Sequence, residues 1–265
     1  MISKNTIKLV HSLELKKNRL RERLFVAEGP KVVRDMTGKF KLHALIATNR
    51  WLEENKIDAK DIDSPTLWTQ RPLGVINVTD DELRRTSFLQ HPQQVMAIFA
   101  LPDNDTTANV NPTEELVVAL DGVQDPGNLG TIIRIADWFG IHHIVCSHTT
   151  ADAYNPKVVQ ATMGSLANVD IHYIDLPDFL SSLPSTTGIY GTFLDGTNIY
   201  ETPLAANGII VMGNEGNGIS DETRNTITHR LLIPDFNPTK SADSLNVAIA
   251  TSIVCSEFRR RNCNY

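Results

Sequence analysis

The second half of the chain alternates between short apolar runs and segments with helical spacing. The apolar runs predict buried strands at 116–120, 144–146, 188–193, 209–212 and 231–233. The segments between them predict helices at 131–139, 156–163 and 177–183, a short helix capped by Ser220 or Asp221, and a last helix from about Ser244 to Arg261. Strands that alternate with helices indicate an α/β fold whose parallel sheet is covered by helices on both faces.

The amino-terminal part predicts a smaller α/β domain. A helix is expected over 3–15, and the charged stretch 16–23 is expected to continue as helix. The other predicted elements are strands at 24–27, 42–47 and 94–100 and a helix at 80–85. A stretch rich in Pro, Asn, Asp and Thr, with only Ala108 and Val110 apolar, follows Leu101 and has linker composition. We therefore predict domains at 1–101 and 115–265 joined by a linker at 102–114.

The charge of the chain is unevenly distributed. The 265 residues are 41% hydrophobic and 21% charged, as in ordinary globular proteins, and the net charge of −6 does not favour a nucleic-acid partner. Residues 1–41, however, contain eleven Lys or Arg and only four Asp or Glu. The remainder holds 14 bases and 27 acids. A basic arm on an acidic body indicates one surface that faces a polyanion, although charge alone equally fits a solvated helix face.

Cysteine content and hydropathy limit the cellular compartments in which the protein is expected. The three cysteines have no CxxC spacing, so neither a disulfide framework nor a zinc site is expected, and adjacent His142 and His143 would point to opposite faces of a strand. We therefore expect no metal. No apolar run approaches the roughly 18 residues that span a bilayer. The sequence thus predicts a cytoplasmic protein without a membrane partner.

Three loops that follow predicted strands carry candidate chemistry, because open parallel sheets bind ligands at the carboxyl ends of their strands. The first runs from Asp121 into a helix, with Asn128 near the helix start and Arg134 about two turns further. The second, 211–220, places three glycines around an amide and a carboxylate. The third begins at Ile233-Pro234 and ends at SLNVAIA, from Ser244 to Ala250.

Each loop alone also has an ordinary structural explanation. The first could be a tight strand-to-helix turn, the second a glycine-rich turn before a helix cap, and the third a Ser244 cap. A dinucleotide-binding oxidoreductase is a rival interpretation, but the chain lacks GxGxxG at the first loop and lacks the GK[ST] of a P-loop.

Taken together, DPGNLGTIIRIADWFG, GNEGNGIS, and IP followed by SLNVAIA resemble the three motifs of the SpoU/TrmH family of RNA 2′-O-ribose methyltransferases, in the SPOUT superfamily. The resemblance covers roughly 116–261. The segment EGPKVVRD, 28–35, is similar to the L30e-like substrate-binding domain that many members carry first. The resemblance implies a deep trefoil knot in the carboxyl-terminal domain, S-adenosylmethionine as cofactor, a homodimer formed through the knotted domain, and RNA as substrate.

The resemblance also implies roles for individual residues. The implied cofactor-binding residues are Thr192, Gly213, Asn214, Ile233 and Leu245. The implied catalytic residues are Arg134, Asn128, Glu215, Ser244 and Asn246. The candidate RNA-binding residues on the basic arm are Lys16, Lys17, Arg19, Arg21, Arg23 and Lys31. The arginine has been considered a general base in the family, but a guanidinium almost never loses its proton, so we expect Arg134 to hold a phosphate or to stabilise a developing alkoxide.

We therefore expect a methyltransferase that modifies a ribose 2′-hydroxyl of structured RNA. The two-domain layout resembles the branch that acts on ribosomal RNA more than the branch that acts on transfer RNA. A transfer-RNA enzyme and a catalytically idle RNA-binding member are the alternatives. One departure from the family pattern is the loop 235–243, which is about three residues longer than usual. It could change the edge of the cofactor pocket or serve substrate choice through Phe236 and Lys240.

Overall fold

The chain folds into two compact units. The computed structural model describes residues 1–56, 67, 69–102, 107, 109–237 and 244–262. Unit 1 combines Met1–Asp103 with Asp152–Ala167, and unit 2 combines Asn104–Ala151 with Asn168–Tyr265. We had placed all of 115–265 in one domain, whereas the structure groups Asp152–Ala167 with the amino-terminal residues. Residues 103–106 and 108 of the predicted linker lie outside the described part.

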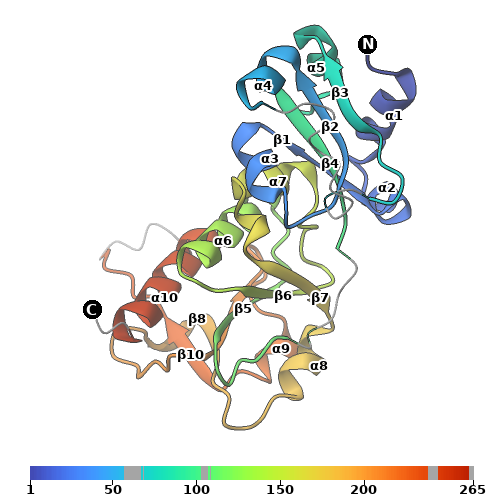
Figure 1. Ribbon diagram of the computed structural model, residues 1–265. Helices are drawn as coiled ribbons and strands as arrows, with labels where there is room; N and C mark the ends of the chain where they lie inside the picture. The colour runs from blue at the N-terminus through green and yellow to red at the C-terminus, as the bar shows by residue number, and fades with distance from the viewer. Residues whose placement is uncertain (57–66, 68, 103–106, 108, 238–243, 263–265) are drawn as a thin grey trace. The chain divides into compact units, whose positions relative to one another are not determined.

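Unit 1 is built on a four-stranded mixed sheet in the order β1-β4-β2-β3 (Figure 1). The strands are β1 (Leu24–Glu28), β2 (Leu42–Thr48), β3 (Gly74–Val78) and β4 (Val95–Ala100). Strand β4 runs antiparallel to both β1 and β2, and β2 runs parallel to β3. Strand β3 was not predicted, because it is a half-buried edge strand without a continuous apolar run.

The helices of unit 1 are α1 (Lys4–Ser12), α2 (Lys16–Glu22), α3 (Pro30–Met36), α4 (Asn49–Glu54), α5 (Asp80–Thr86) and α7 (Pro156–Thr162), with a 3₁₀ turn at Ser165–Ala167. The charged stretch is helical as predicted, but it is separated from α1. The Arg19 guanidinium binds the carbonyl oxygens of Leu13 and Glu14, each at 2.7 Å. These two carbonyls lie in the break between α1 and α2, so the guanidinium satisfies backbone groups there that a helix would otherwise pair.

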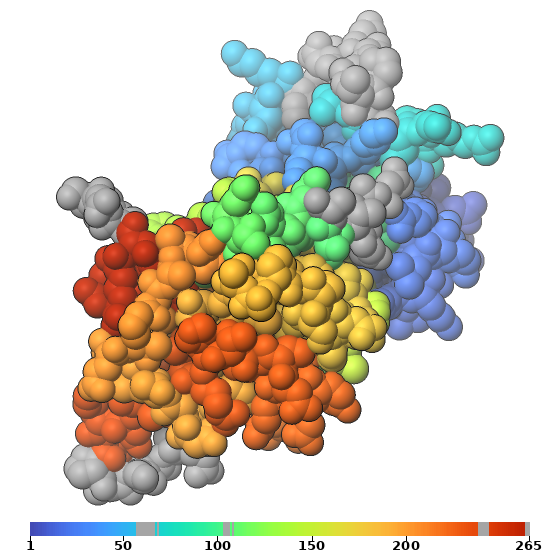
Figure 2. All heavy atoms as spheres, turned by 90° about the horizontal axis from the view of Figure 1, so that it is seen from below, coloured from blue at the N-terminus to red at the C-terminus, as the bar shows by residue number. Residues whose placement is uncertain are grey.

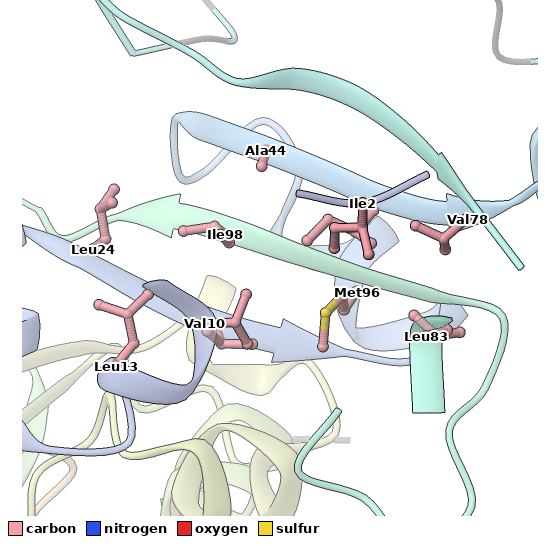
Figure 3. Close-up of a cluster of buried hydrophobic side chains, with 11 residues drawn as sticks. Ile2, Val10, Leu13, Leu24, Ala44, Val78, Leu83, Met96 and Ile98 are labelled. Atoms are coloured by element: carbon pink, nitrogen blue, oxygen red, sulfur yellow. The ribbon is translucent and has the colours of Figure 1, made fainter. Parts of the chain in front are cut away.

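Apolar side chains cover both faces of the unit 1 sheet. One face packs Val10 and Leu13 from the amino-terminal helical segment against Leu24, Met96 and Ile98 (Figure 3). On the other face the Phe25 ring lies 5.0 Å from the ring of Tyr154, measured between centroids. Tyr154 belongs to the later segment of unit 1, and α7 also packs on β1. This packing explains why Asp152–Ala167 is part of the unit.

Unit 2 confirms the predicted α/β fold. Its six strands are parallel in the order β10-β8-β9-β5-β6-β7. They are β5 (Leu116–Asp121), β6 (His143–Ser147), β7 (Asp170–Ile174), β8 (Ile189–Asn198), β9 (Gly208–Gly213) and β10 (His229–Leu232). Strand β7 was missed, since its polar residues interrupt the apolar pattern. The trefoil knot implied by the family resemblance stays a prediction.

Helices cover both faces of the unit 2 sheet. They are α6 (Pro126–Trp138), α8 (Leu176–Ser181), α9 (Asp221–Arg224) and α10 (Val247–Asn262). Val117 and Ala119 of β5 pack with residues of α8, while the intervening Val118 is equally buried on the opposite face. Helices α6 and α10 pack on each other, and α8 and α9 lie side by side at the surface (Figure 2). Within the described residues, no helix has the length and apolarity that a membrane span requires.

Candidate active site

A cavity of about 590 Å³ opens in unit 2 at the ends of strands β9 and β10 and beside the middle of β8. Strand β8 pairs with β9 only through Ile189–Gly191, and the residues that follow, 192–195, form one wall of the cavity. The residues of the other walls come from the loops after β9 and β10 and from the start of α10. All five implied cofactor residues line this cavity, namely Thr192, Gly213, Asn214, Ile233 and Leu245. Glu215 and Ser244 from the implied catalytic set line it as well.

The glycine-rich loop after β9 is held in a closed turn by Asn214. The backbone groups of Asn214 and Gly218 exchange two hydrogen bonds of 2.9 Å. The Asn214 side-chain oxygen accepts from the N–H groups of Gly216 and Asn217, and its amide donates to the carbonyl of Gly122 at 2.7 Å. The Asn214 side chain is therefore occupied in shaping the loop, and any ligand contact that it makes would come from its backbone.

Gly213 occupies a position where a side chain has no room. A Cβ placed there would lie 2.3 Å from the carbonyl carbon of Gly218 and 2.4 Å from the nitrogen of Ile219. Both atoms belong to backbone, which cannot move aside as a flexible side chain can. The glycine thus allows two backbone segments to meet at the floor of the cavity.

Three of the implied catalytic side chains form one hydrogen-bonded chain. The amide of Asn246 donates to Oδ1 of Asn128 at 2.9 Å, and the amide of Asn128 donates to Oε1 of Glu215, also at 2.9 Å. The second Glu215 oxygen accepts from the Gln124 N–H at 3.4 Å. These residues come from the three separate loops identified in the sequence. The structure therefore brings the three motifs to one place.

The starts of α6 and α10 fix the orientation of this chain. Asp125 caps α6 by accepting from the Asn128 N–H at 2.8 Å, so the helix begins at Pro126 rather than at the predicted residue 131. Asn246 caps α10, because its Oδ1 accepts from the N–H groups of Ala248 and Ile249. The predicted helix start at about Ser244, with Ser244 as a plausible cap, was wrong: α10 begins at Val247, and Ser244 is an exposed residue of the cavity wall.

The cap of α9 follows the sequence prediction. Ser220 accepts from the Thr223 N–H, and its own N–H and hydroxyl both donate to Oδ2 of Asp121, at 2.8 and 2.7 Å. Asp121 ends β5 and is buried. The carboxylate therefore ties the end of β5 to the loop that closes the cavity.

A cluster that the sequence did not reveal forms part of the cavity wall. The guanidinium carbons of Arg230 and Arg224 lie 3.8 and 5.2 Å from the centroid of the Phe193 ring. Arg230 also donates a hydrogen bond to Asp195, and this bond holds the pKa of the Asp195 carboxyl below its ordinary value. Phe193, Asp195 and Arg224 line the cavity. The two arginines lie outside the three motifs and have no diagnostic spacing, so nothing in the sequence could have identified them.

Comparison with known proteins assigns the three loops of this site to one family. Residues 115–256, which hold all three loops, match the SpoU rRNA methylase family. The chain belongs to the SpoU rRNA methylase family. Residues 4–97 match the MRM3-like substrate binding domain. The relation that we inferred from the three motifs is thereby confirmed.

Members of the SpoU family and solved structures align along nearly the whole chain. The 23S rRNA (guanosine(2553)-2′-O)-methyltransferase RlmP of Bacillus subtilis is 28% identical over 249 residues, covering 93% of each protein. A protein from Porphyromonas gingivalis assigned to the TrmH family of RNA methyltransferases is 42% identical, with a TM-score of 0.84 over 98% of this chain and 99% of its own. The AdoMet-bound rRNA methyltransferase of Sinorhizobium meliloti has 29% identity and the same TM-score, over 100% and 97%.

Arg134 of this SpoU family member lies apart from the hydrogen-bonded chain. It is exposed on α6 and does not line the cavity. Among the described residues, no hydrogen bond or ion pair to its guanidinium is found. The geometry within one chain therefore leaves Arg134 available to an external group, and its catalytic role remains a prediction.

Only some of the basic side chains predicted to bind RNA are exposed to solvent. Lys16, Lys17, Arg21 and Arg23 are exposed on or just after α2. Lys31 lies on α3, half-exposed, and binds Asp35 and the carbonyl oxygen of Met163, each at 2.6 Å. The prediction that Arg19 binds RNA is wrong, because its side chain is buried.

Arg19 is part of the interior of unit 1. Its side chain is 2% exposed and forms an ion pair with Asp152 as well as the two carbonyl contacts at the end of α1. A guanidinium that is buried and fully paired cannot reach a phosphate. Its helix was read correctly from the sequence, but its inward direction depends on Asp152, which lies 133 residues further along the chain. Arg19 is therefore a structural residue.

Of the longer loop 235–243, the structure describes residues 235–237. Phe236 is 82% exposed just beyond the cavity residue Ile233. Lys240, which we considered for substrate choice, lies outside the described residues, as do the other positions of 238–243.

Proposed function

We propose that this chain transfers a methyl group from S-adenosylmethionine to a ribose 2′-hydroxyl of ribosomal RNA. The observation that carries the proposal is the row of hydrogen bonds that joins Asn246, Asn128 and Glu215. It brings the three family motifs together beside the cavity that Gly213 lines. Relatives named as 23S rRNA 2′-O-methyltransferases, RlmP and RlmB of Neisseria meningitidis, support ribosomal RNA as the substrate class. No observation on this chain favours transfer RNA.

The cavity suits the cofactor. Its volume of about 590 Å³ falls within the usual range for small-molecule sites, and the missing Cβ at Gly213 leaves backbone as its floor. We assign binding to the backbone around Gly213, Ile233 and Leu245 and to the wall at Thr192. When bound, S-adenosylmethionine supplies an activated methyl group on its sulfonium. The AdoMet-bound structures of relatives from Sinorhizobium meliloti and Streptomyces viridochromogenes support this assignment.

The protein then has two tasks, because a ribose hydroxyl is a weak nucleophile at neutral pH. It must align the hydroxyl with the methyl group and ease the loss of its proton. Both Glu215 oxygens already accept hydrogen bonds, so we assign this carboxylate to orienting Asn128 rather than to accepting the proton. We assign Arg134 to the negative charge that develops on the ribose oxygen or to a neighbouring phosphate, since a guanidinium stays protonated.

Unit 1 is the part of the chain that we expect to grip the RNA. It matches a substrate binding domain over residues 4–97, and α2 carries the exposed side chains of Lys16, Lys17 and Arg21. Phosphate neutralisation by such side chains makes binding depend steeply on salt. The affinity for ribosomal RNA should accordingly fall as the salt concentration rises, and a flat dependence would contradict this role.

We further propose that two copies associate through unit 2. Helices α6 and α10 pack on each other, and each exposes a large apolar side chain: Trp138 of α6 is 85% exposed and Ile249 of α10 is 53% exposed. Exposed apolar side chains of this size favour an interface. Sedimentation of the wild type as a dimer and of Trp138→Glu as a monomer is expected, and a monomeric wild type at micromolar concentration would refute the proposal.

We place the reaction in the cytoplasm. The described cysteines, Cys146 and Cys255, are buried free thiols, and burial raises the pKa of Cys255 to about 12. Such thiols neither pair nor react readily. They fit a reducing compartment.

The decisive experiment maps ribose methylation in total RNA by mass spectrometry. Cells without the gene, with the gene restored, and with Arg134→Ala are compared. We expect one 2′-O-methyl mark to vanish on deletion and to return only with the intact protein. Unchanged RNA in all strains would point to an idle RNA-binding member instead.

A further inference from the structure

Unit 2 has few described cationic side chains, and most of them form hydrogen bonds or ion pairs within the protein. All six are arginines: Arg134, Arg224, Arg230, Arg259, Arg260 and Arg261. Four of them have protein partners, Arg259 through two backbone carbonyl oxygens, Arg260 and Arg261 through Glu257, and Arg230 through Asp195. For Arg134 and Arg224, no hydrogen bond or ion pair is present within the described residues. Of these two, only Arg224 lines the cavity.

Arg224 contacts an aromatic ring at the cavity wall, and among the described residues it has no hydrogen-bonded acid, although its charge acts on the nearby Asp195 carboxylate. It ends α9, is exposed, and has its guanidinium carbon 5.2 Å from the centroid of Phe193. Arg230 lies 3.8 Å from the same centroid. Cation–π contact orients a guanidinium without neutralising its charge.

The two guanidiniums at Phe193 differ in their partners. Arg230 is hydrogen-bonded to Asp195, and the other carboxylate of the cavity lining, Glu215, accepts from Asn128 and from the Gln124 N–H. Among the described residues, Arg224 is therefore the cation of the cavity lining whose guanidinium has no hydrogen-bonded carboxylate. An oriented guanidinium with free N–H groups is a strong site for an anion such as phosphate or carboxylate.

We propose that Arg224 binds a phosphate group of the RNA substrate at the mouth of the cavity. This inference rests on the proposed function. Residues 115–265 contain eight Lys or Arg against sixteen Asp or Glu, so an RNA backbone that approaches the reaction centre meets an acidic domain. A local cation offsets that repulsion where the target ribose must enter. The exposure of Arg224 to solvent favours an RNA phosphate over the carboxylate of the cofactor.

The test compares Arg224→Gln with a matched control, Arg260→Gln. Both remove one positive charge from unit 2, but Arg260 is 67% exposed at the end of α10 and does not line the cavity. The probes are in vitro transcribed 23S ribosomal RNA and S-adenosylmethionine. For Arg224→Gln we expect RNA affinity near 0.1 M salt to fall about five- to tenfold, and the slope of log K against log salt to decrease in magnitude by about 0.7–0.9. Cofactor affinity stays within about twofold, and Arg260→Gln behaves as the wild type.

Arg224→Lys adds a second arm to the test. Lysine keeps the charge and binds phosphate as a point charge, so the salt slope should return to the wild-type value. An unchanged RNA affinity and slope in Arg224→Gln would overturn the proposal. Weaker cofactor binding with normal RNA binding would assign Arg224 to the cofactor carboxylate, and equal losses in both Gln variants would leave only a general charge effect. If the wild type itself neither binds this RNA nor transfers methyl groups, it is the proposed function that fails.

Discussion

The side-chain amide of Asn246 donates a 2.9 Å hydrogen bond to Oδ1 of Asn128, a residue 118 positions earlier in the chain. At the same time Oδ1 of Asn246 accepts from two N–H groups of α10. The cap fixes which end of the amide is the donor, and this in turn directs the Asn128 amide toward Glu215. One residue therefore links the start of a helix to the orientation of the proposed active site.

Asn246→Asp separates the two tasks of this residue. Aspartate keeps an oxygen for the helix cap but cannot donate to Asn128. We expect thermal stability close to wild type and a loss of methyl transfer on the order of a hundredfold, because the Asn128 amide loses its orientation. Asn246→Ala should in addition lose about 1 kcal/mol of stability with the cap. Full activity of Asn246→Asp in a single-turnover assay would show that the hydrogen bonds linking Asn246, Asn128 and Glu215 are only structural.

Gly213→Ala should abolish cofactor binding. The new Cβ would lie 2.3 Å from backbone of Gly218, so the loop that floors the cavity must open. Gly216→Ala is the matched control, since its Cβ would meet only the Asn214 side-chain oxygen at 3.6 Å. Titration calorimetry with S-adenosylmethionine should give wild-type affinity for Gly216→Ala and no measurable binding for Gly213→Ala. Equal affinities would contradict the proposed floor.

Glu257 should make the folded state sensitive to acid. Hydrogen bonds from Arg260 and Arg261 lower its pKa from 4.5 to about 2. A lowered pKa in the folded state stabilises that state above pH 4.5, and this contribution is lost as the pH falls toward 2. We expect Glu257→Gln to lower the free energy of unfolding by about 1–2 kcal/mol at pH 7, allowing for solvent screening. Denaturant titrations of both proteins should converge as the pH approaches 2; a constant difference would exclude the ion pairs as its cause.

Ionisation of Glu28 should lower the stability of the folded state, whereas ionisation of Glu257 raises it. Burial raises its pKa above 4.5 despite hydrogen bonds from Ser87 and the Phe88 N–H. A raised pKa means that ionisation costs the folded state stability, and that this cost disappears once the pH falls below 4.5. Glutamine can accept from the Phe88 N–H and donate to Ser87 without carrying a charge. The melting temperature of Glu28→Gln should therefore equal or exceed that of the wild type at pH 7, and a clear drop would refute this assignment.

Local patterns were sufficient to predict most elements of unit 2. Buried parallel strands appear as continuous apolar runs, so β5 and β9 were recognisable without any partner. Strands β3 and β7 were missed, since a strand at the edge of a sheet needs no such run. The position of the α10 start was also misjudged, because Ser244 and Asn246 are both good caps and only the tertiary fold selects between them.

The sequence by itself determined the family of this protein, through three motifs in order that carry the amide, carboxylate and guanidinium side chains of Asn128, Glu215 and Arg134. The tertiary structure decided which side chains meet. In the sequence Arg19 resembles its basic neighbours, but in the structure it is buried in unit 1 and paired with Asp152. Arg224 has no distinguishing feature in the sequence, but in the structure it contacts Phe193 at the cavity. Both outcomes depend on partners far away in the sequence. Periodicity and motif spacing describe only neighbours along the chain, whereas burial and charge pairing are set by neighbours in space.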